Sequence, residues 1–430
     1  MTYDQTIEYL YNQLPVFQKI GKKAIKPKLT NIILLCEALG NPQNDFKSVH
    51  IAGTNGKGSS SHFMASILQE AGFKVGLYTS PHLKDFRERF RINGNLISKQ
   101  FVIDFVENNK ALIEKIEPSF FEVTVALAFK VFSEEKVDYA IIEVGLGGRL
   151  DSTNIISPIC CHITNIGFDH MDVLGQTLPE IASEKAGIIK SNTPVVISEY
   201  TEETKIVFSQ KAFDNHSSIY FASDYYEMVE VSDHLDSLNL KIKNKETQEI
   251  IQINSGLVGL YQIANIIGIL KLSDVLQSIG VEITQNNILL GIKNVIHNTH
   301  LKGRWQIIGR NPIVICDTGH NEHALKITLK RLKEADFNNL HLILGFVKDK
   351  DLEKVFGLLP EEAKYYFTTF DSFRAMQSEE LVDYASKYGL ISLPFPDVNT
   401  AIEHVKAIST EKDIIFVCGS TYLVAEIKDL

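Results

Sequence analysis

The sequence predicts an α/β fold of two domains, each with a parallel sheet. Three observations predict it. Short apolar runs bounded by turn residues alternate with segments of helical period, several of these runs lack polar alternation, and the pattern restarts near residue 300. Strands buried on both faces are typical of parallel sheets that helices cover on both sides. Regular alternation of strand and helix indicates α/β architecture.

The elements of the first domain follow from these runs in chain order. The runs VDYAIIEVG (137–145) and ICCHITNIG (159–167) are the clearest buried strands, because neither alternates with period two. The expected strands are Ser48–Gly53, Lys74–Ser80, Val137–Gly145, Ile159–Ile166 and Pro194–Ser198. The expected helices are Ser59–Gly72, Phe121–Glu135 and Val258–Ile279. Residues 200–252 alternate polar and β-branched side chains, which favours strands and hairpins.

The second domain is predicted after a polar, glycine-containing linker at about 296–303. Its expected strands are Ile313–Asp317, Leu340–Phe346, Tyr365–Phe370 and Ile414–Cys418, and its expected helices are Glu322–Glu334 and Asp351–Leu359. We therefore expect two α/β domains, one over 1–297 and a smaller one over 298–430.

Composition excludes several classes of protein. The 430 residues are 44% hydrophobic and carry 43 Lys+Arg against 53 Asp+Glu, a net charge of −10, so nucleic acid is not expected as the main partner. No run approaches the ~20 apolar residues of a membrane helix, and the N-terminus lacks the features of a secretory signal. The 5 cysteines form no C-x-x-C pair, which argues against a disulfide framework and a zinc site. We expect a cytoplasmic protein without a membrane partner.

A glycine-rich turn, Gly53-Thr-Asn-Gly-Lys-Gly-Ser59, lies between the first expected strand and the first expected helix. In this context glycines let backbone N–H groups face an anion, and the helix N-terminus and Lys57 add positive charge. The turn differs from G-x-x-x-x-G-K-[ST] by one inserted glycine, so a standard NTPase is not assured. The alternative is a flexible turn with an exposed lysine. The predicted phosphate-binding residues are Gly53, Thr54, Asn55, Gly56, Lys57, Gly58 and Ser59.

Polar side chains follow two of the expected buried strands. Glu143 ends one, and Asp169 and His170 follow another, so these groups are expected at one edge of the sheet, where α/β proteins bind ligands. An acidic residue there is a natural magnesium ligand beside bound phosphates. The alternatives are a surface carboxylate for Glu143 and a structural histidine. Lys185 lies in a short expected helix, and spacing alone does not exclude a solvated lysine.

Two clusters lie further along the chain. Asn265 is placed at the start of a helix, where it could recognise a base or ribose or simply pack. Arg304 precedes Trp305, and Asp317 and His320 follow a strand of the second domain. An arginine and an Asp/His pair from a second domain would close over a nucleotide held by the first. The lysine-rich stretch Lys19–Lys28 is interpreted as a solvated loop, with attraction of a substrate carboxylate as the alternative.

Taken together, these segments resemble the Mur ligase superfamily and, more closely, the folylpolyglutamate synthase/dihydrofolate synthase family. The resemblance covers most of the chain except 200–252. The matching stretches are GTNGKGS (53–59), TSPHL (79–83), RERFRINGNLIS (87–98), FFE (120–122) with Thr124, EVGLGGRLDSTN (143–154), ITNIGFDH (163–170), LGQTLPEIASEKAGIIK (174–190), the Gln262/Asn265 helix, GRW (303–305) and DTGHN (317–321).

The resemblance implies a Mur-ligase-type P-loop ATPase domain, a smaller Rossmann-like C-terminal domain and the following roles. Loop 53–59, Asn265, Arg304 and Asp317 would bind ATP, with His320 near the phosphates. Two Mg²⁺ ions would be held by Ser80, Glu143 and His170, together with a carbamate formed on Lys185 by CO2. Lys57, Glu143, His170, Lys185 and His320 would be the catalytic residues. Substrate would contact Phe121, Glu122, Thr124, Leu150, Asp151 and Ser152.

The implied reaction adds L-glutamate to dihydropteroate and to the glutamate tails of reduced folates, with ATP forming an acyl phosphate. The chain departs from the family pattern at Tyr261, where histidine is usual, and at Thr318-Gly319 and Glu322 in the DTGHNE motif. Neither departure touches a charged residue of the nucleotide site. The alternatives are another Mur-type peptide ligase, a P-loop kinase or hydrolase, and a nucleotide-binding module without activity. We expect a monomer.

Overall fold

The computed structural model describes residues 1–15, 28–319, 322–348 and 352–430. The chain forms two compact units, each made of several segments. The first comprises Met1–Ser232, Asn239–Gly256 and Gln262–His300, and the second comprises Asp233–Leu238, Leu257–Tyr261 and Leu301–Leu430. Both units are α/β, so the predicted fold class is confirmed.

The first unit is built on an eight-stranded sheet of order β4-β3-β2-β5-β1-β6-β7-β8. Its pairs are parallel from β2 to β8, whereas β3 and β4 are added antiparallel at one edge. The strands are β1 Lys47–Ala52, β2 Val75–Tyr78, β3 Phe90–Ile92, β4 Asn95–Leu96, β5 Tyr139–Glu143, β6 Cys160–Ile163, β7 Val195–Ile197 and β8 Ile219–Phe221. The inner strands β1, β5 and β6 are buried almost throughout, as expected of a sheet covered on both faces.

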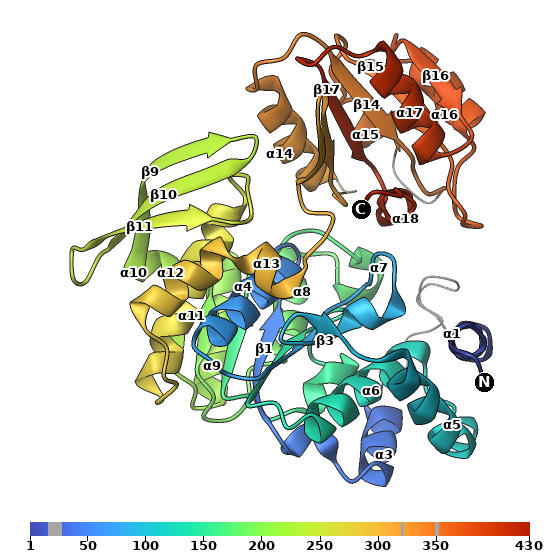
Figure 1. Ribbon diagram of the computed structural model, residues 1–430. Helices are drawn as coiled ribbons and strands as arrows, with labels where there is room; N and C mark the ends of the chain where they lie inside the picture. The colour runs from blue at the N-terminus through green and yellow to red at the C-terminus, as the bar shows by residue number, and fades with distance from the viewer. Residues whose placement is uncertain (16–27, 320–321, 349–351) are drawn as a thin grey trace. The chain divides into compact units, whose positions relative to one another are not determined.

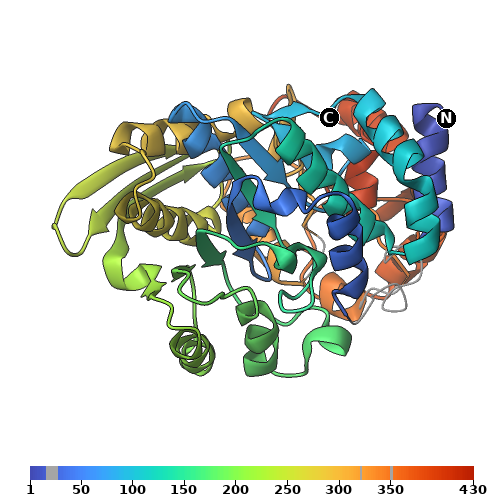
Figure 2. The same cartoon turned by 90° about the horizontal axis from the view of Figure 1, so that it is seen from below.

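Helices pack around this sheet (Figures 1 and 2). One hydrophobic cluster joins Ala140 and Ile142 of β5 to α5 and α6, and another joins Cys161 of β6 to α8 and α9. The helices of this unit are α1 Tyr3–Gln13, α3 Thr30–Ala38, α4 Lys57–Glu70, α5 Lys99–Ile116, α6 Phe120–Glu134, α7 Met171–Leu174, α8 Leu178–Ala186, α9 Glu202–Asp214, α10 Ala222–Tyr225, α11 Gln262–Ser278, α12 Gln285–Lys293 and α13 Val295–Thr299, with short 3₁₀ turns at Pro42–Asn44, Phe86–Arg89 and Ser152–Ile155. All five cysteines of the chain are buried, as expected of packing residues.

A three-stranded sheet of order β11-β10-β9 follows in the chain. Its strands are β9 Tyr226–His234, β10 Ser237–Asn244 and β11 Ile250–Ser255. The expectation of strands over 200–252 is correct here but wrong for Glu202–Asp214, which is helix α9. Thr201 forms a capping box at its start, and Thr204, Phe208 and Ala212 are buried at helical spacing.

The second unit contains a six-stranded sheet of order β12-β13-β17-β14-β15-β16, parallel except for the β12–β13 pair. Its strands are β12 Gln306–Arg310, β13 Ile313–Cys316, β14 Leu340–Leu344, β15 Lys364–Thr368, β16 Ser392–Phe395 and β17 Ile414–Cys418, and its helices are α14 Glu322–Lys333, α15 Leu352–Phe356, α16 Ser378–Ser386, α17 Val398–Ile408 and α18 Thr421–Ala425.

Several expected boundaries differ from the structure by a few residues, and two of the differences have a clear local cause. The predicted helix over Val258–Ile279 begins at Gln262, because the preceding turn contains Gly259 at φ +104. The predicted linker at 296–303 is partly helical, since α13 extends to Thr299. Among the helices that the structure describes, none combines the length and the hydropathy needed to cross a membrane.

Candidate active site

The predicted phosphate loop connects β1 to α4 in the first unit, and the end of β6 fixes its backbone. The Thr54 N–H donates to the carbonyl of Asn165 at 2.9 Å, and the Asn55 N–H donates to the Asn165 side chain at 2.9 Å. The Thr164 hydroxyl donates to the Asn55 carbonyl at 2.6 Å. The loop is therefore held before any ligand arrives, which lowers the entropic cost of binding an anion.

Gly53 is required at its position by close packing. Its φ is +149°, and a Cβ built there would lie 1.8 Å from the Thr164 hydroxyl oxygen. We expect Gly53→Ala to destabilise the protein by about 2 to 3 kcal/mol, because Thr164 must move or lose its bond to the loop. Urea unfolding measures this. Gly40→Ala is the matched control, since Gly40 also has positive φ (+85°) but nothing lies within 4 Å of its Cβ position. Equal losses in the two variants would show that backbone strain alone, not packing, requires glycine at position 53.

Two lysines donate to the same backbone carbonyl of the loop. Lys57 Nζ lies 2.9 Å and Lys185 Nζ 2.9 Å from the Gly53 oxygen. Lys185 comes from α8 and is only 4% exposed, which excludes the solvated-lysine alternative. Burial, together with the charge of Lys57, lowers the pKa of the Lys185 amine to about 7. A neutral amine, unlike an ammonium ion, is nucleophilic, so a substantial share of Lys185 can react as a nucleophile near neutral pH.

Glu143 ends β5 beside the first turn of α4. Its side chain is 5% exposed, so it is not a surface carboxylate, and its Oε2 accepts the Ser80 N–H at 3.0 Å. A Cβ added to Gly58 would lie 3.7 Å from Oε1 of Glu143, so the glycine keeps space open next to the carboxylate. The structure thus brings Glu143, the Ser80 backbone and the start of α4 together.

His170 lies after β6, at the start of α7. Its φ is +47°, its side chain is 41% exposed, and its Nε2 lies 3.8 Å from a carboxylate oxygen of Asp169. Asp169 and Asp151 both contribute negative potential at Lys185. Within the described ranges, no group of three His, Cys, Asp or Glu side chains forms a ready-made metal cage.

The start of α11 packs against the phosphate loop. Gln262 Nε2 donates to the Ser59 hydroxyl at 3.3 Å, and Asn265 Nδ2 donates to Gln262 Oε1 at 2.8 Å. A Cβ on Gly56 would lie 2.2 Å from Asn265 Oδ1, so the helix and the loop are in close contact. Gln262 belonged to the matching stretches but was not predicted as a site residue; its spacing of three from Asn265 was the available signal.

The predicted substrate residues lie together, although several already serve the fold. Phe121 and the Asp151 carboxylate both lie against Gly145, 2.4 and 3.2 Å from its Cβ position. Glu122 accepts the Ser119 N–H at 2.7 Å and so caps α6, while Asp151 accepts the Leu146 N–H at 2.8 Å. These bonds shape the surface that a substrate would meet. They also occupy carboxylate oxygens of Glu122 and Asp151 that would otherwise be available to accept from a substrate. The other predicted members are Thr124, which is buried and bonded to the Tyr78 hydroxyl, the half-buried Leu150, and Ser152.

In the second unit, the predicted nucleotide-binding residue Asp317 accepts two backbone hydrogen bonds. Asp317 is 5% exposed; its Oδ2 accepts the Trp305 N–H at 2.7 Å and its Oδ1 accepts the Gly319 N–H at 2.6 Å. Arg304 is exposed. His320 lies outside the described residues, as do Lys19, Lys22, Lys23 and Lys26 of the lysine-rich stretch.

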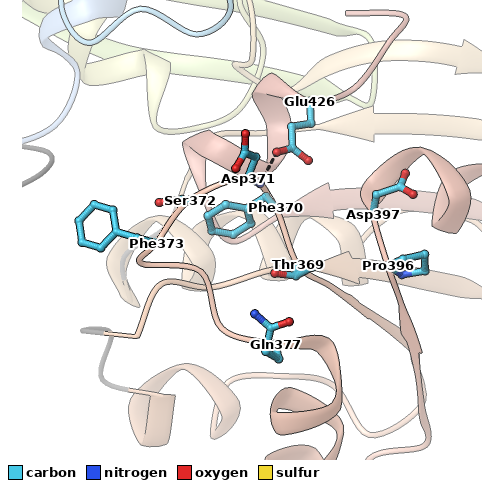
Figure 3. A pocket seen from close by; sticks show the side chains of 9 residues that line it. All are labelled: Thr369, Phe370, Asp371, Ser372, Phe373, Gln377, Pro396, Asp397 and Glu426. Atoms are coloured by element: carbon cyan, nitrogen blue, oxygen red, sulfur yellow. Dashed lines mark hydrogen bonds between the residues drawn. The ribbon is translucent and has the colours of Figure 1, made fainter. Parts of the chain in front are cut away.

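A cavity of about 690 Å³ lies elsewhere in the second unit, beyond the end of β15 (Figure 3). Asp371, Asp397 and Glu426 line it, and Glu426 accepts the Asp371 N–H at 2.6 Å. None of the predicted site residues lines this cavity.

Comparison with known proteins agrees with this geometry. Residues 51–272 match the Mur ligase middle domain, and residues 303–421 match the Mur ligase glutamate ligase domain. The chain belongs to the Mur ligase family. Within that family it is similar to the dihydrofolate synthase/folylpolyglutamate synthase of Bacillus subtilis, 31% identical over 95% of both chains.

Two further proteins extend the comparison. A probable bifunctional folylpolyglutamate synthase/dihydropteroate synthase of Haloferax volcanii is 32% identical over 99% of this chain, which spans 50% of that protein's length. The solved structure of Escherichia coli FolC in complex with DHPP and ADP has a TM-score of 0.81 and 28% identity, covering 99% of this chain and 96% of that one. The chain is thus a member of the folylpolyglutamate synthase/dihydrofolate synthase branch of the Mur ligases.

The residues at the Glu143 edge of this loop fit the oxygen ligands that a Mg²⁺ ion takes. Magnesium takes oxygen ligands, keeps several waters and is usually held by one or two carboxylates plus phosphate oxygens. Glu143 is a buried carboxylate, Ser80 carries a hydroxyl, and Gly58 leaves space next to Oε1. These groups fit an ion held largely by bound phosphate and water.

Proposed function

We propose that this Mur ligase joins L-glutamate to dihydropteroate and to the glutamate tails of reduced folates, using ATP to form an acyl phosphate. One observation carries the proposal: the phosphate loop, the buried Glu143 carboxylate and the buried Lys185 amine lie at the carboxyl ends of β1 and β5. The relative from B. subtilis is named for both synthase activities, and FolC was solved with DHPP and ADP.

The reaction needs ATP because an amide does not form spontaneously from a carboxylate and an ammonium ion in water. The substrate carboxylate attacks the γ-phosphate, the bond to ADP breaks, and an acyl phosphate results. The amine of glutamate then attacks the activated carbonyl, phosphate leaves with its electron pair, and the amine loses a proton. Catalysis of both steps relies on positioning and charge stabilisation.

The loop residues supply the phosphate site. Backbone N–H groups of the glycine-rich turn and the N-terminus of α4 face the phosphates, and Lys57 adds a positive charge. Lys57 Nζ now bonds the Gly53 and Thr54 carbonyls, so it would exchange these for phosphate oxygens. Arg304, Asp317 and Asn265 stay predicted contacts of ATP.

Two Mg²⁺ ions, when bound, would neutralise phosphate charge, with Ser80, Glu143, His170 and a carbamate on Lys185 as their protein ligands. The neutral Lys185 amine supports this role, because it can add to CO2, lose a proton and become an anionic oxygen donor. The carbamate would also remove the repulsion between Lys185 and Lys57.

The test is glutamate-dependent release of ADP from Mg-ATP, with dihydropteroate and a reduced folate monoglutamate compared as acceptors. We expect turnover with both acceptors, and none without glutamate. Turnover with one acceptor alone would restrict the proposal to that synthase activity. Equal ADP release without glutamate would overturn the ligase assignment in favour of a P-loop hydrolase. Inactivity with both acceptors would direct the search to other Mur-type substrates.

A further inference from the structure

The turn before β12 has an uncommon backbone conformation. Trp305 has a φ of +44° and follows Gly303 at +69°. A bulky residue with positive φ costs roughly 1–3 kcal/mol and persists only where its surroundings hold it. Arg304, predicted to contact ATP, lies between these two residues. The contacts that hold Trp305 therefore also fix the backbone position from which the Arg304 side chain extends.

Three contacts within the second unit hold the Trp305 side chain. Its Nε1 donates to the carbonyl of Leu235 at 2.9 Å, and its ring packs 5.5 Å from that of Phe416. The guanidinium of Arg331, from α14, lies 4.2 Å from the ring centroid, a cation–π contact. Trp305 is 2% exposed, so these contacts are shielded from solvent.

Arg331 is anchored on its other side by the β9–β10 hairpin, at the last two residues of β9. Its Nη2 lies 2.6 Å from an oxygen of Asp233 and also donates to the carbonyl of His234. Both side chains of this ion pair are almost buried, with 8% and 11% of the side-chain surface exposed. Removing the partner of a desolvated guanidinium is strongly destabilising, because it leaves a buried charge without compensation. The ion pair therefore fixes the arginine over the ring.

We propose that Arg331 is a positioning residue for the nucleotide contacts of the second unit. Arg331 holds the Trp305 ring, and the Trp305 N–H donates to Oδ2 of Asp317. The same turn fixes the backbone position of Arg304. Arg331 touches neither ATP nor the reacting atoms in this proposal. The proposal rests on the proposed function, because Arg304 and Asp317 matter only if the protein binds a nucleotide.

The experiment compares Arg331→Gln with Arg310→Gln. Arg310 also pairs with an aspartate of the same hairpin, Asp236 at 3.3 Å, but both side chains are more than half exposed. We expect Arg331→Gln to raise the KM for ATP about tenfold, equivalent to about 1.4 kcal/mol, and to leave the KM for the folate acceptor unchanged. We expect no effect from Arg310→Gln. Arg331→Lys should recover part of the ATP affinity, because it keeps the charge but loses the planar stacking.

A second readout does not depend on catalysis. The chain contains 1 tryptophan, so fluorescence excited at the long-wavelength edge, where tryptophan absorbs and tyrosine does not, reports Trp305 alone. Acrylamide should quench it more strongly in Arg331→Gln than in the wild type or Arg310→Gln. If Arg331→Gln does not fold, Asp233→Asn tests the same anchor from its other side and should shift both readouts in the same direction by less.

The outcomes separate the two proposals. A lower melting temperature with unchanged KM for ATP and unchanged quenching would show that Arg331 is merely structural, and would overturn the positioning role. Inactive wild-type enzyme would overturn the proposed function instead. In that case ADP affinity, measured by titration calorimetry, still distinguishes Arg331→Gln from Arg310→Gln; equal affinities would overturn the positioning role too.

Discussion

Replacing Glu143 with glutamine is expected to lower kcat by about 10²–10³-fold, because a preorganised charge next to the phosphates is lost. Glutamine keeps the size of the side chain and an oxygen to accept the Ser80 N–H. The variant should therefore fold, while an ion that neutralises phosphate loses its buried carboxylate. Steady-state ADP release over a range of Mg²⁺ concentrations measures the effect, with circular dichroism to check the fold.

Glu199→Gln is the matched control. Glu199 follows β7 at the same edge of the sheet as Glu143, but it is exposed and accepts from the Asn165 side chain at 3.3 Å. It should retain full activity. If Glu143→Gln remained within about tenfold of wild type, equivalent to about 1.4 kcal/mol, the role of Glu143 at the phosphates would be wrong. Full ATP binding without turnover in the wild type would favour a nucleotide-binding module.

Lys185→Ala is expected to be inactive, and acetate or propionate should restore part of its activity. The substitution removes a buried side chain and leaves room for a small carboxylate where the proposed carbamate would lie. Rescue that rises with acid concentration and saturates would identify the missing group as a carboxylate. Lys190→Ala is the control, because Lys190 is also partly buried and donates to a carbonyl, that of Asn154 at 2.7 Å. It should be active, and acids should not stimulate it.

The wild type should depend on both pH and CO2. The Lys185 pKa is lowered to about 7, so the amine is protonated below this pH and neutral above it. Only the neutral amine adds to CO2. Added bicarbonate should therefore raise activity above pH 7 and have little effect well below it, when measured after depletion of dissolved CO2. Stability follows the same sign: above about 7 the unfolded chain holds a proton at Lys185 that the folded chain does not, so this group's contribution improves as pH rises. No response to bicarbonate at any pH would contradict a carbamate.

The sequence was informative where chemistry and local geometry coincide. The turn from Gly53 to Ser59 was predicted as a phosphate site because its glycines let backbone N–H groups face an anion. The structure shows a second reason for two of them, since Gly53 and Gly56 pack against Thr164 and Asn265. Glu143 could be placed at a strand end because its run of apolar residues has no alternation. Its burial, like that of Lys185, could not be predicted, since it depends on how α4 and α8 pack on the sheet.

Other features were missed although local signals existed. Helix α9 begins with Thr201 as its cap and buries residues at helical spacing, but the β-branched texture around it favoured strands. The Ser119–Glu122 pair is a capping box, which explains why the Glu122 carboxylate bonds the start of α6. Arg331 carried no signal, because its partners Asp233 and Trp305 are far away in the sequence and meet only in the folded unit.

The division of the chain into discontinuous segments limits how the protein can be taken apart. The second unit draws Asp233–Leu238 and Leu257–Tyr261 from the middle of the chain, in addition to Leu301–Leu430. A fragment cut at residue 300 would lack the Leu235 carbonyl that accepts from Trp305 and the aspartate that pairs with Arg331. The C-terminal part is therefore not a portable module: a chimera that exchanges it between relatives must carry these two short segments along, or keep their side chains matched to the incoming half.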